Sequence, residues 1–265
     1  MSAETDDMTE KFDSGVLLVD KPAGKTSFAM IKVLRRLTGI RKIGHAGTLD
    51  PFATGLLVIC VGRKATRMIS SFMDGHKEYM ATVELGKIST TQDPEGEISR
   101  GDQQPDYSKN DIEQILDRFR GSIMQTPPAF SALKHKGKPL YHYARQGITI
   151  EKSPREVHIH QLEWLDPRAE VDNAQPFLSL RVRCSKGTYI RTLADDIGQA
   201  LGCGAYLTSL RRTASGFFSV EDSLSGRDLY SDGAAALVQS ELLSIEHVQK
   251  LLQKSDGMDN VQCSS

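Results

Sequence analysis

The chain contains 265 residues, of which 39% are hydrophobic and 25% are charged, as in an ordinary globular protein. This length suits one large domain or a main domain with an appendage, and no apolar run approaches the roughly 20 residues that span a bilayer. The four cysteines include no Cys-x-x-Cys pair, so neither a zinc site nor a disulfide framework is indicated. These features predict a protein of the reducing cytoplasm with no membrane partner.

The net charge of −1 conceals an uneven distribution of charge along the chain. Residues 1–13 carry −4 and residues 221–265 carry −5, so residues 14–220 carry +8. Residues 127–155 alone carry +5. A basic body with acidic ends is compatible with a polyanionic partner, and equally with a solvated basic face. The acidic start lacks the apolar core of a secretory signal, and we expect residues 1–13 to be disordered.

The first half of the body shows clear local patterns. Residues 15–19, GVLLV, form a short apolar run typical of a buried strand. A helix is predicted through SFAMIKVLRRLTG, where apolar residues recur at helical spacing and Gly39 ends the pattern. A loop, GHAGTLDPFATG, covers residues 44–55 and leads into a second buried-strand run, GLLVICVG. Residues 78–85 alternate between apolar and polar side chains, which predicts a half-exposed strand.

The second half continues this mixture of elements. A polar helix is predicted around residues 109–119, followed by the proline-opened basic segment PPAFSALKHKGKPLYHYARQGI. Strands are predicted near 156–165 and 177–184, and KGTYIRTLADDIGQALG then turns into a helix. Because strands and helices mix without strict alternation, we predict an α+β fold with a central mixed sheet flanked by helices and loops.

The loop 44–55 places a single acidic residue, Asp50, among glycines, a proline and small side chains. A structural turn is the simple interpretation, because Asp-Pro preceded by Gly-Thr is ordinary loop chemistry. The functional alternative is a loop that holds one carboxylate rigidly at the floor of a cleft. The loop by itself leaves both interpretations open.

Two further motifs partly match ligand-binding patterns. The segment DKPAGKTS follows a strand and precedes a helix, but a phosphate-binding loop needs a glycine five residues before Gly24, where the chain has Val19. Binding of a nucleotide triphosphate is therefore not supported. His158 and His160 share one face of a predicted strand, yet no third ligand is near, which favours surface histidines over a metal site.

Arg191 and Tyr79 also have simple interpretations when each is taken alone. Arg191 lies in the first turn of its predicted helix, four residues before Asp195. A surface pair between these two is worth roughly a few tenths of a kcal/mol, and the alternative is an arginine aimed at a carboxylate elsewhere. Tyr79 lies on the apolar face of its strand and is by default a core tyrosine.

Five segments, in this order and across roughly residues 14–218, resemble the TruB family of tRNA pseudouridine synthases. They are GVLLVDKPAGKTS, GHAGTLDPFATGLLVICVG, KEYMATVELGKISTTQDPEG, PPAFSALKHKGKPLYHYARQGI and CSKGTYIRTLADDIGQALGCGAYLTSLRRTASG. The resemblance implies the pseudouridine synthase fold, with a catalytic domain over residues 14–220. It also implies conversion of uridine to pseudouridine in the T loop of tRNA, at position 55, with no metal, nucleotide or other cofactor.

The family's chemistry gives the lone aspartate a role. Pseudouridine formation breaks the N1–C1′ bond, turns the uracil and rejoins it through C5, so it needs a nucleophile or charge stabiliser and a proton-transfer partner. By the resemblance Asp50 takes the first role, whether by attacking the nucleotide or by assisting glycosidic cleavage. Arg191 matches the arginine that pairs with this aspartate, and we expect it to lower the pKa of Asp50. Tyr79 matches the tyrosine that stacks on the target base and helps to move its proton.

The resemblance also implies residues that contact the RNA. His45 matches the histidine that fills space in the RNA when the uridine is flipped out. Lys21 matches a lysine that supports the active-site floor, and we group it with the RNA-contacting residues. The insertion 123–155 resembles the segment that clamps the T arm of the RNA. The remaining expected contacts are all cationic: Lys134, Lys136, Lys138, Arg145, Arg211 and Arg212.

The chain departs from longer family members after its last matching segment. Those members continue into an RNA-binding module of the PUA type, whereas residues 221–265 are expected here to be a short acidic extension. We expect this extension to be partly disordered and to contain one short helix over 236–253.

Two functions fit the basic surface. One is an enzyme that acts as a monomer on the T arm of tRNA, and the other is a non-catalytic tRNA-binding protein or tRNA folding chaperone. The set of Asp50, Tyr79 and Arg191 favours the enzyme, because binding alone needs no buried carboxylate that faces an anionic partner.

Overall fold

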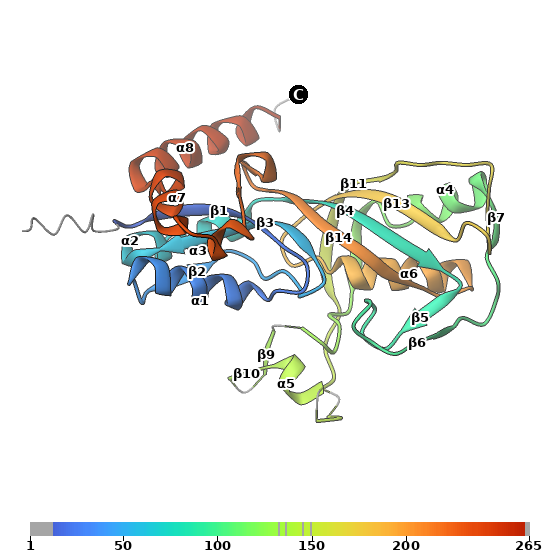
Figure 1. Ribbon diagram of the computed structural model, residues 1–265. Coiled ribbons are helices and arrows are strands. Elements are labelled where there is room, and N and C mark those ends of the chain that lie inside the picture. Colours follow the sequence, from blue (N-terminus) through green and yellow to red (C-terminus); the bar gives the residue numbers. More distant parts are fainter. Residues whose placement is uncertain (1–12, 132, 136, 145, 149, 263–265) are drawn as a thin grey trace, which may run out of the picture.

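The computed structural model describes residues 13–131, 133–135, 137–144, 146–148 and 150–262 (Figure 1). Its main feature is an eleven-stranded sheet with the strand order β16-β1-β3-β14-β4-β13-β11-β8, to which β2, β15 and β17 add short pairings. Helices cover both faces of this sheet, and a separate arm that contains α5 projects from it, at the bottom of Figure 1.

The strands of the main sheet are β1 (Gly15–Lys21), β2 (Ile43–His45), β3 (Thr54–Val61), β4 (Lys77–Leu85), β8 (Gly121–Gln125), β11 (Arg155–Trp164), β13 (Phe177–Cys184), β14 (Ala205–Ser215), β15 (Phe218–Ser219), β16 (Leu224–Ser225) and β17 (Leu243–Ser244). Three smaller pairs are β5 (Lys87–Ser89) with β6 (Ile98–Arg100), β7 (Asp106–Ser108) with β12 (Glu170–Asp172), and β9 (Lys134–His135) with β10 (Lys138–Pro139). The helices are α1 (Ser27–Thr38), α2 (Gly62–Thr66), α3 (Ile69–Asp74), α4 (Lys109–Asp117), α5 (Leu140–Ala144), α6 (Ile190–Leu201), α7 (Ala234–Glu241) and α8 (Ile245–Gln262), with 3-10 turns η1 (Val220–Asp222) and η2 (Asp228–Tyr230).

Two parallel pairings make the sheet mixed. β1 runs parallel to β16 and β3 runs parallel to β14, while the other neighbours are antiparallel. The predicted α+β fold with a central mixed sheet is therefore confirmed.

β1 and β3 are buried on both faces. Leu17 and Val19 belong to the core cluster that includes residues of α1, whereas Val16 and Leu18 belong to a second cluster that includes Val248 of α8. Figure 1 shows α1 and α8 on opposite sides of these strands. Burial on both sides explains why the sequence has continuous apolar runs here instead of an alternating pattern.

The helix α1 has well-formed ends. The Thr26 hydroxyl accepts a hydrogen bond from the backbone N–H of Ala29 at 3.0 Å. Gly39 adopts a left-handed conformation with φ of 68° and donates its N–H to the carbonyl of Arg35. These caps fix the two ends of the helix that the sequence predicts. Hydrogen bonds between Ser27 and Leu49 place its start beside the loop that carries Asp50.

Two segments differ from the expectation. The single helix expected over 236–253 is wrong, because α7 and α8 occupy this region with β17 between them. No strand is predicted from the sequence over residues 205–215, where the structure has the central strand β14. Its pairing with β4 shifts register between Leu207 and Ser209 and again between Arg212 and Ala214, and such bulges hide the two-residue alternation.

Among the described helices, none is long and apolar enough to cross a membrane.

Candidate active site

A pocket of about 440 Å³ opens beside the loop between β2 and β3. Its walls include residues 47–50 of that loop, Tyr79 of β4 and residues 185–191 that lead into α6. Asp50, Tyr79 and Arg191 thus meet in one pocket, although they lie on three segments that are far apart in the sequence. This convergence favours the functional interpretation of the loop over a simple turn.

The glycines of this loop allow a close approach of two backbone segments. Gly55 lies opposite Arg212 in the parallel pairing of β3 with β14, and its φ is +98°. A Cβ atom on Gly55 would lie 2.2 Å from the carbonyl oxygen of Arg212, so a side chain there would push the strands apart. Gly47 also has a φ of +98°, and a Cβ on it would lie 3.2 Å from Nη1 of Arg212. The glycines therefore hold the loop tightly against β14.

Lys21 lies beneath the loop with an exposed fraction of 0%. Its ammonium donates hydrogen bonds to the carbonyl oxygens of Pro22 (2.9 Å), Lys25 (2.6 Å) and Pro51 (3.2 Å). Burial lowers the pKa of Lys21 to about 8, and the nearby Asp50 carboxylate opposes this effect. This position supports the floor of the site from within and leaves the ammonium no surface for contact with RNA.

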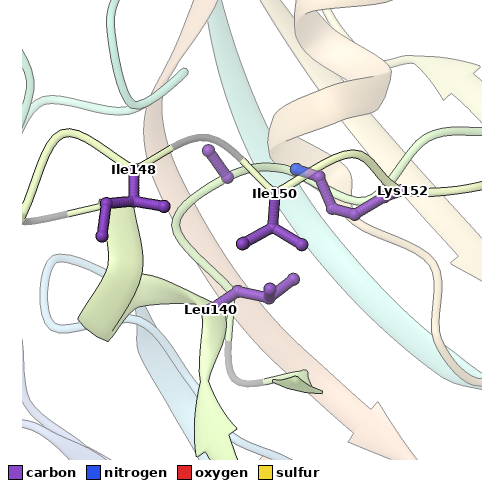
Figure 2. Close-up of a pocket in the computed structure, with 5 residues that line it drawn as sticks. Leu140, Ile148, Ile150 and Lys152 are labelled. Atoms are coloured by element: carbon purple, nitrogen blue, oxygen red, sulfur yellow. The ribbon is translucent and has the colours of Figure 1, made fainter. Parts of the chain in front are cut away.

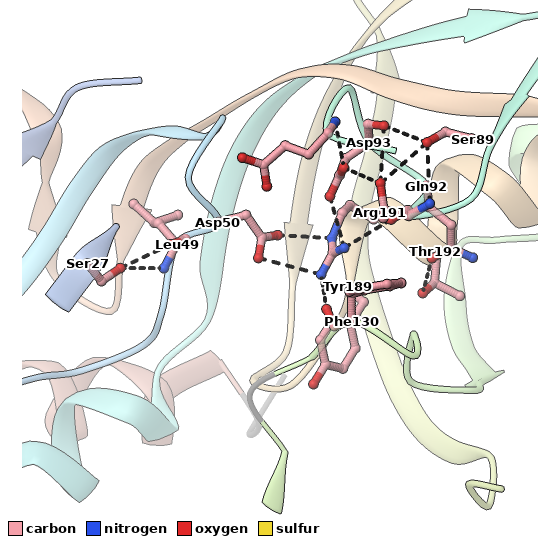
Figure 3. A network of polar contacts seen from close by, with 12 residues as sticks. Ser27, Leu49, Asp50, Ser89, Gln92, Asp93, Phe130, Tyr189, Arg191 and Thr192 are labelled. Atoms are coloured by element: carbon pink, nitrogen blue, oxygen red, sulfur yellow. Dashed lines mark hydrogen bonds and ion pairs between the residues drawn. The ribbon is translucent and has the colours of Figure 1, made fainter. Parts of the chain in front are cut away.

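Arg191 is the ion partner of Asp50 (Figure 3). Its Nε lies 2.9 Å from Oδ2 of Asp50, and its Nη2 lies 3.5 Å from Oδ1. The Arg191 side chain is 4% exposed, whereas that of Asp50 is 33% exposed. Arg191 is therefore aimed at a carboxylate distant in sequence, and Asp195 instead accepts hydrogen bonds from Gln92 and Gln199, at 2.9 Å each.

A second carboxylate, Asp93, binds the far side of the same guanidinium (Figure 3). Nη1 of Arg191 lies 3.0 Å from Oδ2 of Asp93, whose side chain is 3% exposed. Nη1 also donates to the carbonyl of Thr91 at 3.0 Å, and Nη2 donates to the carbonyl of Phe130 at 2.7 Å. Each nitrogen of the guanidinium thus has an acceptor, which fixes the orientation of Arg191 relative to Asp50.

Burial raises the pKa of Asp50 above its ordinary value. Arg191 and Lys21 oppose this rise, and the neighbouring Asp93 carboxylate adds to it. The contribution of Arg191 has the expected sign, since it lowers the pKa, although the net shift is upward. Loss of hydration on burial is the largest effect and outweighs the arginine, and the Asp93 carboxylate raises the pKa of Asp50 further.

Tyr79 faces Arg212 across the pairing of β4 with β14, at the wall of the pocket. Burial raises the pKa of its phenol above the ordinary value, and the Arg212 guanidinium opposes the rise. The phenol therefore keeps its proton at neutral pH and can donate a hydrogen bond to a bound group.

Comparison with known proteins decides the family. The model of the TruB family pseudouridylate synthase N-terminal domain matches residues 35–190. The model of the tRNA pseudouridylate synthase B C-terminal domain matches residues 191–253. The chain belongs to the TruB family.

TruB relatives match the chain over most of its length. The tRNA pseudouridine synthase B of Desulfotalea psychrophila is 56% identical over 245 residues, which cover 92% of this chain and 99% of that protein. The protein of the same name from Protochlamydia amoebophila is 46% identical over 218 residues, 82% of this chain and 80% of that protein. A solved structure, the Cbf5-Nop10-Gar1 complex, contains a chain that is 31% identical with a TM-score of 0.60. The match covers 81% of this chain and about half, 53%, of the solved one.

Two of the arginines that the TruB resemblance assigns to RNA contacts, Arg211 and Arg212, are consecutive residues of β14. Arg212 is 1% exposed, and it donates to the carbonyls of Leu56 (Nε, 2.7 Å) and Gly47 (Nη2, 3.2 Å). Arg211 forms a two-point ion pair with Asp20, at 2.9 and 2.7 Å, and its side chain is 40% exposed. Arg212 is thus an internal support of the catalytic loop, which corrects its expected place at the surface, while Arg211 keeps an accessible edge.

His45 ends β2 and is half-buried beside the loop. Burial lowers the pKa of its imidazole below the ordinary value, Arg212 adds to this effect, and the backbone of Gly47 opposes it. The ring is therefore neutral at neutral pH, which suits a side chain that fills space among bases.

Most of the insertion 123–155 forms the projecting arm that contains α5 (Figure 1). Inside it, Leu140, Ile148 and Ile150 surround a space of about 10 Å³, beside the side chain of Lys152 (Figure 2). This space holds at most a single water, so the arm has a small apolar core of its own. Of its expected RNA contacts, Lys136 and Arg145 lie outside the described residues, and the side chains of Lys134 and Lys138 do as well.

Two residues of the TruB site are missed by sequence reasoning, namely Gln92 and Asp93. The segment TTQDPEG indicates a turn, and its Asp-Pro pair is the available local signal. Gln92 has a φ of 64°, the one positive φ among the described non-glycine residues. Its side-chain amide bonds to Asp195 and Thr192, and this arrangement directs the Asp93 carboxylate toward Arg191.

The described residues include no group of three or more His, Cys, Asp or Glu side chains that could hold a metal ion. His158 and His160 are both exposed on β11, with ring centroids 4.7 Å apart. Their position agrees with surface histidines.

Proposed function

We propose that this chain isomerises uridine to pseudouridine in tRNA. Relatives named tRNA pseudouridine synthase B are 46–56% identical to it over 82–92% of its length. The structural observation that carries the proposal is the ion pair of Asp50 with Arg191 in a pocket that also presents Tyr79. The target we propose is the uridine at position 55, in the T loop.

The first step is entry of the uridine into the pocket. Its reacting atoms are inaccessible in a stacked loop, so the nucleotide is flipped out of the RNA, at a cost of a few kcal/mol. A pocket of about 440 Å³ lies in the usual range for sites that enclose a small molecule. His45, beside the loop, takes the space that the flipped base leaves in the RNA.

The bond changes then require one carboxylate. Asp50 attacks the nucleotide or stabilises positive charge at C1′ while the N1–C1′ bond breaks. The uracil turns and C5 bonds to C1′. C5 then gives up its proton and N1, no longer bonded to the sugar, takes one up, so that the product is an isomer of the substrate. Asp93 is buried behind Arg191, so the pocket presents a single carboxylate instead of the facing pair that a glycosidase uses.

The other pocket residues have supporting roles in this proposal. Arg191 orients the Asp50 carboxylate and favours its charged form. Tyr79 stacks on the target base and, as a protonated phenol, takes part in moving its proton. Lys134, Lys136, Lys138, Arg145 and the accessible edge of Arg211 contact RNA phosphates, and the arm closes over the T arm. The enzyme works as a monomer in the cytoplasm, where tRNA is found.

The test uses an unmodified tRNA transcript that carries tritium at uridine C5. Formation of the C5–C1′ bond releases this label, so we expect release by the wild type, mapped to one T-loop uridine. Asp50→Asn is expected to bind the tRNA but to release no label. Substantial release by Asp50→Asn would refute the role of this aspartate.

The alternative is a non-catalytic tRNA-binding protein or folding chaperone. It predicts tight, salt-sensitive binding without tritium release from the wild type. The geometry favours the enzyme, because the Asp50 carboxylate faces the pocket and would repel RNA phosphates if the pocket served binding alone.

A further inference from the structure

The positive charge of the chain is concentrated in one lobe. Residues 14–73 carry ten lysines and arginines against two acidic residues, whereas residues 74–220 carry nineteen of each sign. Both acidic residues of the lobe are paired with arginines from outside it. Eight of the ten cations are exposed, and no ion pair within the described part of the chain involves them. Residues 221–265, which carry −5, pack on β1 and α1 through η2, α7 and α8, but none of their described carboxylates forms an ion pair with these eight cations. The eight side chains are therefore available to an anionic partner.

Two exposed aromatic side chains lie near the start of α1, one from this lobe and one from the neighbouring turn η2. Phe28 is 50% exposed and Tyr230 of η2 is 48% exposed. Lys32 Nζ and the Arg35 guanidinium lie over the Phe28 ring, 5.3 and 5.7 Å from its centroid. Lys25 Nζ lies 5.5 Å from the centroid of Tyr230, and η2 contacts α1. We call these five residues the α1 platform.

The α1 platform is joined to the loop that carries Asp50. Ser27, next to Phe28, donates its hydroxyl to the carbonyl of Leu49 at 3.1 Å and accepts the N–H of Leu49 at 2.9 Å (Figure 3). Gly24 donates its N–H to the carbonyl of Pro51 at 2.8 Å. Both neighbours of Asp50 are therefore fixed to the segment that starts α1. In Figure 1, α1 also lies on the lower side of the sheet, from which the arm projects.

We propose that the α1 platform binds unpaired nucleotides of the substrate RNA, next to the uridine that enters the pocket. Each nucleotide of RNA offers a base with a flat face and a negatively charged phosphate. Bases stack on exposed aromatic rings, and phosphates pair with the lysines and arginines beside them, as in single-strand binding surfaces. The α1 platform offers both features, because each of its two rings has a lysine or arginine beside it. The inference rests on the proposed function, because it assigns this surface to the substrate of that site.

The test measures binding of the full-length protein to an unmodified tRNA transcript. Phe28→Ala and Tyr230→Ala are each expected to raise Kd about tenfold, as loss of one stacked base does, while Phe28→Trp keeps the wild-type Kd. Lys32→Ala is expected to reduce the slope of log Kd against log salt by about 1. The matched controls are Phe177→Ala, an aromatic side chain 40% exposed on β13, and Lys109→Ala at the start of α4.

The outcomes separate the two proposals. An unchanged Kd in the Phe28→Ala, Tyr230→Ala double variant overturns the α1 platform, and so does an equal loss in Phe177→Ala. Single-turnover tritium release at saturating RNA should recover the wild-type rate in Phe28→Ala. A rate that stays low there means that the Asp50 loop has moved, which also overturns the role in binding. Absence of release by the wild type, whatever its Kd, instead refutes the proposed function.

Discussion

Asp50 and Asp93 bind opposite sides of one guanidinium, that of Arg191. The closest contacts are 2.9 Å from Nε to Asp50 and 3.0 Å from Nη1 to Asp93. Asp93 is almost fully buried, whereas Asp50 keeps a third of its surface accessible at the pocket. Asp93 thus fixes the orientation of Arg191, while Asp50 remains accessible from the pocket.

The buried ion pair makes Asp93 important for stability. Asp93→Ala removes the partner of a buried charge, and we expect it to lower the free energy of unfolding by about 3–5 kcal/mol. Asp93→Asn should lower it less, because the amide oxygen still accepts a hydrogen bond from Arg191. Urea denaturation of both variants measures the effect, and a loss below about 1 kcal/mol in Asp93→Ala would contradict it.

Asp93 also affects the pH dependence of activity. In the proposed mechanism Asp50 acts in its ionised form, so kcat/KM is expected to fall as the pH drops through its raised pKa. Asp93→Asn removes a charge that raises this pKa, so the acid limb should move to lower pH. Arg191→Gln removes the opposing cation and should move the limb to higher pH. Shifts of the same sign in both variants would show that these charges do not set the Asp50 pKa.

Gln92 holds the Asp93 loop with a backbone conformation that suits glycine. Gln92→Gly and Gln92→Ala both lose the hydrogen bonds to Asp195 and Thr192, but glycine alone relieves the positive φ of 64°. We expect the glycine variant to be more stable than the alanine variant by about 1 kcal/mol. Thermal unfolding of the two variants tests this order, and a more stable alanine variant would refute it.

Substitution of Gly55 tests the close approach of β3 to β14, and substitution of Gly121, on β8, is the matched control. Both have positive φ, but a Cβ on Gly121 meets no atom within 4 Å, whereas one on Gly55 meets the Arg212 backbone. Gly121→Ala should lower the free energy of unfolding by about 1 kcal/mol, through backbone strain. Gly55→Ala should lower it by several kcal/mol and displace the Asp50 loop, with a fall in single-turnover rate. Equal losses in the two variants would argue against the steric explanation.

Lys21 makes stability depend on pH between about 8 and its ordinary pKa of 10.5. Below pH 8 both states hold the proton, and the cost of burying the ammonium is fully present. Between these values the unfolded chain still binds the proton and the folded protein has lost it, so the free energy of unfolding rises with pH. Relative to Lys21→Met, the wild type should gain roughly 1.5 kcal/mol between pH 8 and 9.5.

The wild type and Lys21→Met share every other titratable group, so their difference in stability isolates the contribution of Lys21. Burial also lowers the pKa of Lys77 to about 8, but Lys77 is present in both proteins and its contribution cancels. Urea denaturation at several pH values gives the difference directly. A difference that stays constant with pH would contradict the lowered pKa of Lys21.

The sequence predicts those helices and strands whose pattern of apolar and polar residues corresponds directly to how they are buried. The apolar runs of β1 and β3 identify strands that are covered on both faces, and Gly39 marks the end of α1. β14 is different, because its two bulges break the alternation by which a strand is recognised. The centre of the sheet is therefore the part that the pattern does not reveal.

In the site, too, some residues have a local signal in the sequence and others have roles that depend on distant contacts. Asp50 stands out by its surroundings, but nothing local connects it with Arg191, 141 positions away. Family resemblance supplies that pairing. Asp93 and Gln92 escape notice because their roles depend on a positive φ and on a hydrogen bond across 103 positions, neither of which leaves a local pattern.

The carbonyl of Phe130, at the root of the projecting arm, accepts a hydrogen bond from the guanidinium that pairs with Asp50. The position of the arm therefore affects the electrostatic environment of the Asp50 carboxylate, because both contact Arg191. Any displacement of that root alters how the positive charge of Arg191 is divided among its acceptors. Under the proposed function, this hydrogen bond connects binding of RNA by the arm with the orientation of the arginine that pairs with Asp50.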